Sequence, residues 1–299
     1  MIHTTQKSRF LDLAALAALA RMRFVTKRHI EGSYSGRHQS RQQGGAGEFV
    51  DFREYSGGED LRRLDWKTLS RTGKAFVRLH QEETNLVCTL AIDASESMQF
   101  GDRKGTKLEY AQYLATALSH IISQGQDQVG LAVLDETLRD TLPPGGTARH
   151  VWTVQEAIEQ LQTRPTTRMQ LALERLFQTG RRRGVLLLMS DFLMEDLEEC
   201  FATLRQFRHR GWEVITLHLI HPDEERLPTG VACRFEGLEG EGRVDCSPEE
   251  IRAAYQEAFS KHLATVRQLA LASGCDYRRI STAVSYLETL GGFLVERAG

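Results

Sequence analysis

The sequence predicts an α/β protein built on a doubly wound, mostly parallel sheet. Apolar runs at residues 86–93, 128–134, 184–190 and 212–219 have the length and composition of buried strands. Amphipathic stretches with helical periodicity lie between these runs. Because parallel strands need crossover helices that cover the faces of the sheet, this alternation favours one sheet with helices on both sides.

The first 80 residues are expected to form a small helix and strand extension. The apolar stretch within residues 9–25 predicts a helix, and the polar, Gly-rich residues 33–47 predict a loop. A polar and aromatic segment at 48–73 leads into a predicted strand at 74–80. We therefore expect an N-terminal extension at 1–80 and an α/β domain at 81–299.

The remaining elements of the α/β domain follow from the same periodicity. We expect helices at 106–123, 149–162, 168–179 and 195–209, a short strand near 137–142, and a turn at 143–146. Beyond residue 219 the sequence predicts a hairpin from 231–237 and 242–246, a helix at 248–272, a strand at 276–279 and a helix at 283–290. Ser247 and Pro248 mark the start of the helix at 248–272, because serine caps helices and proline suits the first helical position.

Oxygen-bearing side chains follow the first strand of this domain. Asp93, Ser95 and Ser97 alternate along the segment that leaves the strand at 86–93, so they can converge on one point. A Mg²⁺-sized ion takes oxygen ligands at about 2.1 Å and suits such a site. Asp and Ser after a strand are also common helix N-caps, and this alternative applies to each residue taken alone.

Two further groups can join this site. Thr167 precedes an amphipathic helix, and Asp191 follows Ser190 at the end of the strand at 184–190. In an open α/β sheet ligands bind outside the carboxyl ends of the strands, where Asp93 and Asp191 both fall if their strands are parallel neighbours. As alternatives, Thr167 fits a capping box with Gln170, and Asp191 can cap the helix near Glu195.

The five residues together resemble the metal-ion-dependent adhesion site of von Willebrand factor A-type domains. The signature of that family is Asp-x-Ser-x-Ser, a distant Thr and a later Asp, and here these are Asp93, Ser95, Ser97, Thr167 and Asp191. The resemblance implies a von Willebrand A-like fold in which these residues hold Mg²⁺ or Mn²⁺. With the whole pattern matched, we favour the metal site over separate helix caps.

A second resemblance covers most of the chain. The segment from Gly47 to Arg71, with Tyr55, Leu61-Arg62 and Asp65-Trp66, is similar to the signature of the bacterial domain of unknown function family fifty-eight, DUF58. Members of that family carry this signature before an A-type domain. The sequence departs from the family at Glu59, where Asp is common, so that a carboxylate lies one methylene further out.

The resemblance implies a metal-dependent protein–protein interaction module. One open coordination position on the ion would accept an Asp or Glu carboxylate from a partner protein. Proteins resembling DUF58 often occur beside MoxR-type AAA+ ATPases, which implies an adaptor or co-chaperone that works with such an ATPase, or with its client, in assembling or maturing a protein complex. The alternative is a metal-dependent hydrolase that uses the Asp93/Asp191 crevice, but no acid/base pair accompanies these residues, so we expect no enzyme.

Charge and composition exclude several other classes. Residues 1–80 hold 15 Lys and Arg against 8 Asp and Glu, a net +7, whereas the rest of the chain has a net −9. Clustered basic residues can attract nucleic acid or an acidic partner, but here acids interleave with them and no nucleic-acid motif is present, so we expect no nucleic-acid partner. No apolar run approaches the ~20 residues of a membrane span.

The cysteine and histidine residues do not predict a zinc site or a disulfide framework. The five cysteines are scattered and form no Cys-x-x-Cys pair: Cys88, Cys200, Cys233, Cys246 and Cys275. His218 and His221 at the end of a strand lack a helix-spaced partner and are interpreted as hydrogen-bonded or exposed histidines. The absence of a disulfide framework fits a cytoplasmic location.

Overall fold

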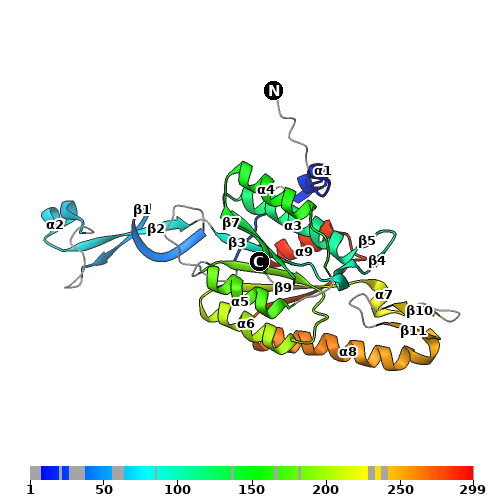
Figure 1. Ribbon diagram of the computed structural model, residues 1–299. Coiled ribbons are helices and arrows are strands. Elements are labelled where there is room, and N and C mark those ends of the chain that lie inside the picture. The colour runs from blue at the N-terminus through cyan, green and yellow to red at the C-terminus, as the bar shows by residue number, and fades with distance from the viewer. Residues whose placement is uncertain are drawn as a thin grey trace. The chain divides into compact units, whose positions relative to one another are not determined.

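The structure is a computed structural model that describes residues 8–19, 22–26, 38–55, 64–84, 86–135, 138–164, 168–180, 183–227, 233–236 and 242–298 (Figure 1). The chain divides into two compact units, one formed by residues 1–26 and 87–299 and the other by residues 27–86. The first 26 residues thus group with the sheet domain, whereas the sequence analysis placed them in the N-terminal extension.

A six-stranded sheet forms the centre of the larger unit. Its strand order is β12-β9-β8-β3-β6-β7, and every neighbouring pair is parallel except the antiparallel pair β6 and β7. The strands are β3 (Val87–Asp93), β6 (Gln128–Leu134), β7 (Leu138–Gly145), β8 (Val185–Ser190), β9 (Glu213–Ile220) and β12 (Asp276–Ser281). All residues of β8 and β9 are buried, as expected for central strands covered on both faces.

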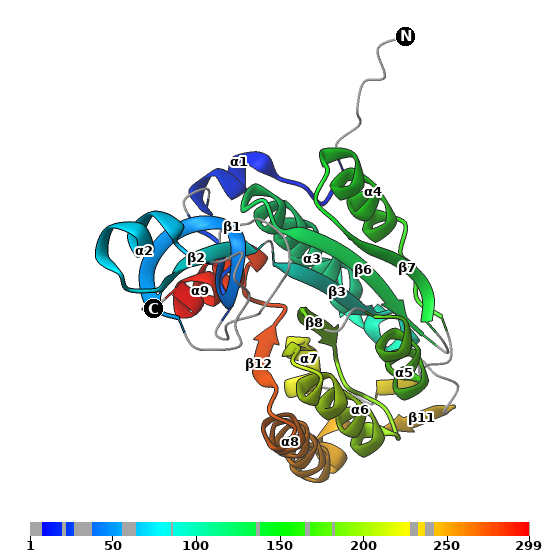
Figure 2. The same ribbon diagram turned by 90° about the vertical axis from the view of Figure 1, so that its left-hand side faces the viewer.

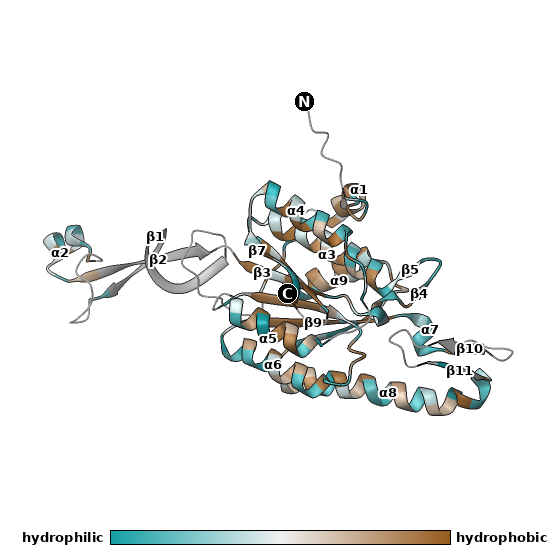
Figure 3. Ribbon diagram, viewed as in Figure 1, coloured by the Kyte–Doolittle hydropathy of each residue, from teal (hydrophilic) through white to brown (hydrophobic). Residues whose placement is uncertain are grey.

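Helices cover both faces of this sheet (Figures 1 and 2). On one face lie α3 (Lys107–Gln124), α4 (Ala148–Glu159) and α9 (Tyr286–Ala298); on the other lie α5 (Met169–Thr179), α6 (Leu197–His209) and α8 (Pro248–Ala272). The apolar colouring concentrates on the sheet, while the helices carry polar residues on their outer sides (Figure 3). This arrangement confirms the predicted α/β fold class.

Shorter elements complete the larger unit. They are α1 (Leu13–Leu16), the 3-10 helices at Ala17–Leu19 and Glu96–Gln99, β4 (Gly101–Asp102), β5 (Gly105–Thr106), α7 (Pro222–Glu225), β10 (Cys233–Glu236) and β11 (Arg243–Cys246). The last two strands pair as the predicted antiparallel hairpin. Among the described residues, no helix combines the length and apolar character that crossing a membrane requires.

A buried arginine joins both ends of the chain to the sheet. The Arg297 guanidinium of α9 pairs with Glu213 of β9 and, at 3.2 Å, with Asp276 of β12, while its Nε donates to the Val25 carbonyl oxygen at 2.7 Å. The guanidinium also lies 5.0 Å from the centre of the Phe24 ring. Because Arg297 is 4% exposed and partnered on every side, we infer that it anchors residues 24 and 25.

In its described residues, the smaller unit is a long antiparallel ribbon with the short helix α2. Strand β1 (His38–Glu54) pairs with β2 (Phe76–Thr84), and α2 (Trp66–Thr72) lies between them in sequence. Asp65 caps α2 by accepting hydrogen bonds from the Lys67 and Thr68 backbone N–H groups at 3.1 and 3.2 Å. Trp66 at the start of α2 is 59% exposed.

Four predicted elements differ from the structure. The helix expected at 9–25 is limited to two short turns within 13–19, and the loop expected at 33–47 is extended from His38 onward, because the Gly-rich sequence pairs with β2. The turn expected at 143–146 is also mostly strand, since β7 continues to Gly145 along the sheet edge. The last helix begins at Tyr286 and runs to Ala298, and it buries Leu290, Phe293 and Leu294.

Candidate metal centre

Asp93 ends the central strand β3 and its carboxylate is buried. The residue is 1% exposed, and both of its oxygens accept hydrogen bonds. Oδ1 accepts from the Ser95 backbone N–H at 2.9 Å, which turns the chain sharply after the strand, and Oδ2 accepts from Ser190 Oγ at 2.6 Å. Ile92 pairs with Met189, so Asp93 and Ser190 follow at the same level of neighbouring strands.

The two predicted serine ligands lie beside each other. Ser95 Oγ and Ser97 Oγ are 3.0 Å apart, and the two residues are 2% and 8% exposed. Ser95 precedes the 3-10 helix at Glu96–Gln99, but its side chain makes no capping hydrogen bond to that helix. The helix-cap alternative therefore fails for Ser95, and its hydroxyl faces Ser97 instead.

The predicted ligand Thr167 lies outside the described residues, but its neighbour Arg164 is placed. Arg164 forms an isolated parallel bridge with Ser95, and its backbone N–H donates to the Ala94 carbonyl oxygen at 2.9 Å. Arg164 thus lies directly alongside the loop that carries Ser95. Gln170, the proposed capping-box partner of Thr167, donates to Glu174 at 2.9 Å.

Asp191 follows β8, the neighbour of β3, and is 2% exposed. Its Oδ1 accepts from the Leu193 backbone N–H at 3.1 Å, and its Oδ2 accepts from Lys107 Nζ at 2.7 Å. Helix α6 begins at Leu197 with Asp196 in the cap position, so Asp191 does not cap that helix. The structure therefore brings Asp93, Ser95, Ser97 and Asp191 to the same edge of the sheet.

The electrostatic environment makes Asp93 difficult to ionise. Burial raises the pKa of Asp93, and the nearby charge of Asp191 raises it further, to about 7, although the hydrogen bonds from Ser190 and Ser95 act in the opposite direction. A divalent cation next to both carboxylates would stabilise their ionised forms. The donor set consists of oxygen atoms alone, which fits a hard cation such as Mg²⁺.

Lys107 and Glu224 belong to this centre, although sequence reasoning did not identify them. Lys107, the first residue of α3, is 0% exposed, and its ammonium contacts both Asp191 and Glu224. Burial alone would lower the pKa of Lys107, but Asp191 and Glu224 outweigh it and raise that pKa above its usual range, which favours the charged ammonium. A lysine in a helix sequence gives no sign that it points inward, because most lysines are exposed.

Ser190 also takes part in the centre. Its hydroxyl donates to Asp93 Oδ2 and accepts from the Phe192 backbone N–H at 2.8 Å. Phe192 has a positive φ of 54°, which is unusual for a bulky residue and turns the chain immediately after Asp191. The position of Ser190 at the end of a buried strand was the signal in the sequence that could have identified it.

A second group of potential ligands lies near this centre. Asp102, His221 and Asp223 each place one ligand atom within 4.8 Å of the others. However, His221 Nδ1 accepts from the Asp223 backbone N–H at 3.2 Å, which in the neutral ring leaves the proton on Nε2. The ring therefore presents an N–H group toward Asp102, whose carboxylate is 3.9 Å away, rather than a lone pair for a metal. His218 is buried and its Nδ1 is paired with the Tyr277 hydroxyl at 3.0 Å, as the sequence analysis expected.

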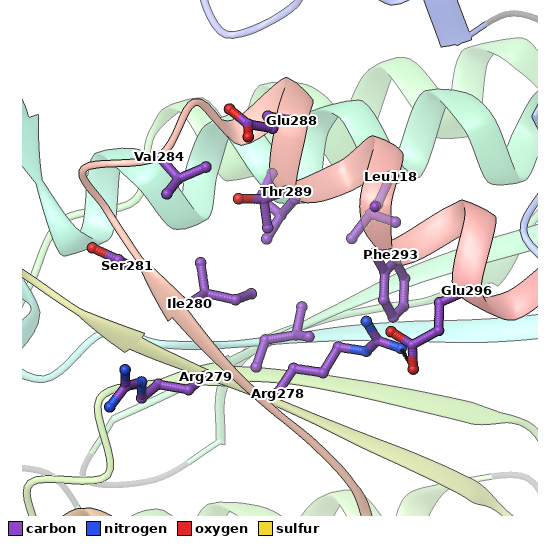
Figure 4. Close-up of a pocket in the computed structure, with 13 residues that line it drawn as sticks. Leu118, Arg278, Arg279, Ile280, Ser281, Val284, Glu288, Thr289, Phe293 and Glu296 are labelled. Carbon is purple, nitrogen blue, oxygen red and sulfur yellow. Dashed lines mark ion pairs between the residues drawn. The ribbon is translucent and has the colours of Figure 1, made fainter.

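A separate pocket lies between β12 and α9 (Figure 4). Its volume is about 460 Å³, and its lining includes Ile280, Val284 and Phe293 together with the ion pair between Arg278 and Glu296 at 2.7 Å. Asp93, Ser95, Ser97 and Asp191, the predicted ligands that the structure describes, do not belong to this lining. The pocket is therefore a feature distinct from the candidate metal centre.

The chain is similar to other proteins and to solved structures over most of its length. "Uncharacterized protein Rv1480" of Mycobacterium tuberculosis is 25% identical over 295 residues, which cover 96% of this chain and 90% of that protein. The crystal structure of the conserved hypothetical protein BatB from Bacteroides thetaiotaomicron is similar at a TM-score of 0.46 and 16% identity, covering 72% of this chain and 99% of that one. The SpRpn10 VWA domain is similar at a TM-score of 0.41 and 12% identity, covering 70% and 95%.

A family model also matches most of the chain. The model of the family described as "Protein of unknown function DUF58" matches residues 51–265. This match includes the end of β1, the whole ribbon strand β2, the candidate metal centre and most of α8. The chain therefore belongs to the DUF58 family.

Proposed function

We propose that this protein is a metal-dependent protein–protein interaction module. In this proposal Asp93, Ser95, Ser97, Thr167 and Asp191 hold Mg²⁺ or Mn²⁺, directly or through water. The observation that carries the proposal is the convergence of two buried carboxylates and two hydroxyls from β3 and β8 at one edge of the sheet. Lys107 compensates the charge of Asp191, but Asp93 is held by hydrogen bonds from Ser95 and Ser190, so a bound cation would offset the cost of burying its charge.

The same geometry supports recognition of a carboxylate from a partner. An ion held by a few side chains at the edge of a sheet keeps open positions that an external Asp or Glu can fill. Leu193, two residues beyond Asp191, is 41% exposed and would offer the partner an apolar contact beside the ion. Such a surface combines one charged anchor with apolar contact, as protein interfaces commonly do.

The partner that we propose is a MoxR-type AAA+ ATPase or its client, with the protein acting as an adaptor or co-chaperone in assembling or maturing a protein complex. The support for this partner is the family membership and the implied association of such proteins with these ATPases. Neither the family description nor the names of the relatives and structures given above describe an enzyme. We therefore take interaction, rather than hydrolysis in the Asp93/Asp191 crevice, as the function.

The experiment has two steps that use the full chain. Calorimetric titration with Mg²⁺ should give heat of binding for the wild type and none for Asp93→Asn. The control is Asp140→Asn, which removes a 70% exposed carboxylate from the edge strand β7 and should bind Mg²⁺ like the wild type. Purified MoxR-type ATPase from the same organism should then bind the wild type in Mg²⁺ but neither the wild type in EDTA nor Asp93→Asn. Equal binding in all samples would refute the metal-dependent mechanism.

A further inference from the structure

The buried ammonium of Lys107 is a fixed positive charge at the candidate metal centre. Its Nζ lies 2.7 Å from Asp191 Oδ2 and also contacts Glu224 Oε1, and the side chain has no exposed area. A carboxylate and an ammonium in this setting are screened little by water or salt. The charge of Lys107 therefore acts at nearly full strength on anything that binds beside Asp191.

The fold holds Lys107 and its partner Glu224 in place. Helix α3, which begins at Lys107, has a capping box between Thr106 and Glu109, and the Lys107 backbone N–H donates to the Phe100 carbonyl oxygen at 3.0 Å. On the other side, Glu224 Oε2 accepts from the His221 backbone N–H at 2.7 Å. These contacts leave Lys107 with little freedom to withdraw its ammonium from the centre.

Lys107 changes the sum of formal charges at the candidate metal centre. Asp93, Asp191 and Glu224 are the buried carboxylates counted at this centre, and with Lys107 their formal charges sum to −2; Asp135, buried after β6, pairs instead with Arg139 and Arg164. A bound divalent cation brings this sum to zero. Without Lys107 the loaded centre would carry −1, and it would repel the carboxylate of a partner.

We infer that Lys107 is a positioning residue whose charge lets the metal-loaded centre accept an external carboxylate. The inference rests on the proposed function, because it concerns the anion that the loaded centre would bind. The ammonium has opposite effects on the two binding steps, since it repels the incoming cation and favours the incoming anion. A residue that only maintains the fold would affect both steps in the same direction.

This difference defines the test, which uses Mn²⁺ and acetate as probes of the full chain. Electron paramagnetic resonance of free Mn²⁺ gives the affinity for the cation. The water-proton relaxation of the Mn²⁺-loaded protein, titrated with acetate, gives the affinity for a carboxylate. Lys107→Met should bind Mn²⁺ about tenfold more tightly and acetate about tenfold more weakly than the wild type, the size expected for removing one nearby unit charge.

Two further variants separate charge from structure. Lys107→Met combined with Glu224→Gln replaces the ion pair by neutral groups of similar size, avoids an unpaired buried acid, and returns the sum of charges in the loaded centre to zero. Acetate affinity should therefore recover toward the wild-type value in this double variant. Lys104→Met removes a charge from an exposed residue of the same loop and should leave both affinities unchanged.

The results can refute the inference in distinguishable ways. If Lys107→Met weakens Mn²⁺ and acetate binding alike and the double variant does not recover, the role of Lys107 is structural and the inference is wrong. Unchanged acetate binding by Lys107→Met, with a wild type that binds both probes, would refute the inference and leave the proposed function intact. A wild type that binds no Mn²⁺ would overturn the proposed function and this inference together.

Discussion

Replacing Asp93 by Asn should make the metal-free protein more stable at neutral and alkaline pH. Asn has nearly the same shape as Asp and can still accept the hydrogen bond from the Ser95 backbone N–H, which is 2.9 Å long in the wild type. It removes the buried charge that Asp191 opposes. Most substitutions of buried, hydrogen-bonded residues destabilise a protein, so an increase in stability would be a specific signature of this centre.

The size and pH dependence of the effect follow from the pKa of Asp93. Burial, and then the charge of Asp191, raise this pKa from 3.8 to about 7. Below pH 3.8 the carboxyl is protonated in both states and costs nothing. Between pH 3.8 and 7 the unfolded state ionises first, so stability is lost as the pH rises, and above pH 7 the full cost of a few kcal/mol is present.

The Asn variant lacks the free-energy cost of burying a charged carboxylate, but it must re-form the hydrogen bond with Ser190 through its amide group. We expect a net gain of roughly 2 kcal/mol in the free energy of unfolding at pH 8 in EDTA, or about 4 to 8 °C in Tm. The gain should shrink at pH 5. Saturating Mg²⁺ should stabilise only the wild type, by about 2.7 kcal/mol at a hundredfold excess over Kd, and so reverse the order of the two proteins.

The assay is thermal unfolding at pH 5, 7 and 8, each in EDTA and in Mg²⁺, with Asp140→Asn as the control for removing an exposed carboxylate. The reasoning would be refuted if Asp93→Asn were less stable than the wild type in EDTA at every pH. That result would mean that the Asp93 charge is already compensated within the protein and that the residue has a structural role.

Three other substitutions test separate parts of the structure. Ser190→Ala removes the 2.6 Å hydrogen bond that lowers the pKa of Asp93, so calorimetry should show about tenfold weaker Mg²⁺ binding; an unchanged affinity would exclude Ser190 from the centre. Arg297→Met leaves Glu213 and Asp276 without their shared buried cation and should cost about 3 to 5 kcal/mol in urea unfolding, whereas a loss below about 1 kcal/mol would show that the arginine is not an anchor. Trp66→Ala changes an exposed residue of α2 and should alter the free energy of unfolding by less than about 0.5 kcal/mol, and a larger loss would reveal a packing role.

The sheet was predictable because its strands are covered on both faces. Continuous apolar runs such as Val185–Met189 can only be buried, and their alternation with amphipathic helices determines a parallel sheet. The two-stranded ribbon was not predictable in the same way. Its first strand contains the polar, Gly-rich residues 38–47, whose extended form depends on pairing with β2 rather than on their own preference.

The candidate metal centre was also predictable from the sequence only in part. Asp93, Ser95, Ser97 and Asp191 could be predicted to meet, because strand-end residues of neighbouring parallel strands share one edge of the sheet. Lys107 and Glu224 could not, because they are 117 positions apart in the chain and neither sequence context distinguishes a buried ion pair from two exposed charges.

The sequence by itself predicted the succession of strands and helices and the candidate oxygen ligands at the carboxyl edge of the sheet, because burial and strand direction leave a local pattern. Tertiary structure alone decided which charges surround those ligands. Ser190 contacts Asp93, and Lys107 contacts Asp191 and Glu224, only after β3, β8, α3 and α7 have packed. Electrostatic interactions depend on distance in space, and no periodicity in the sequence records that distance.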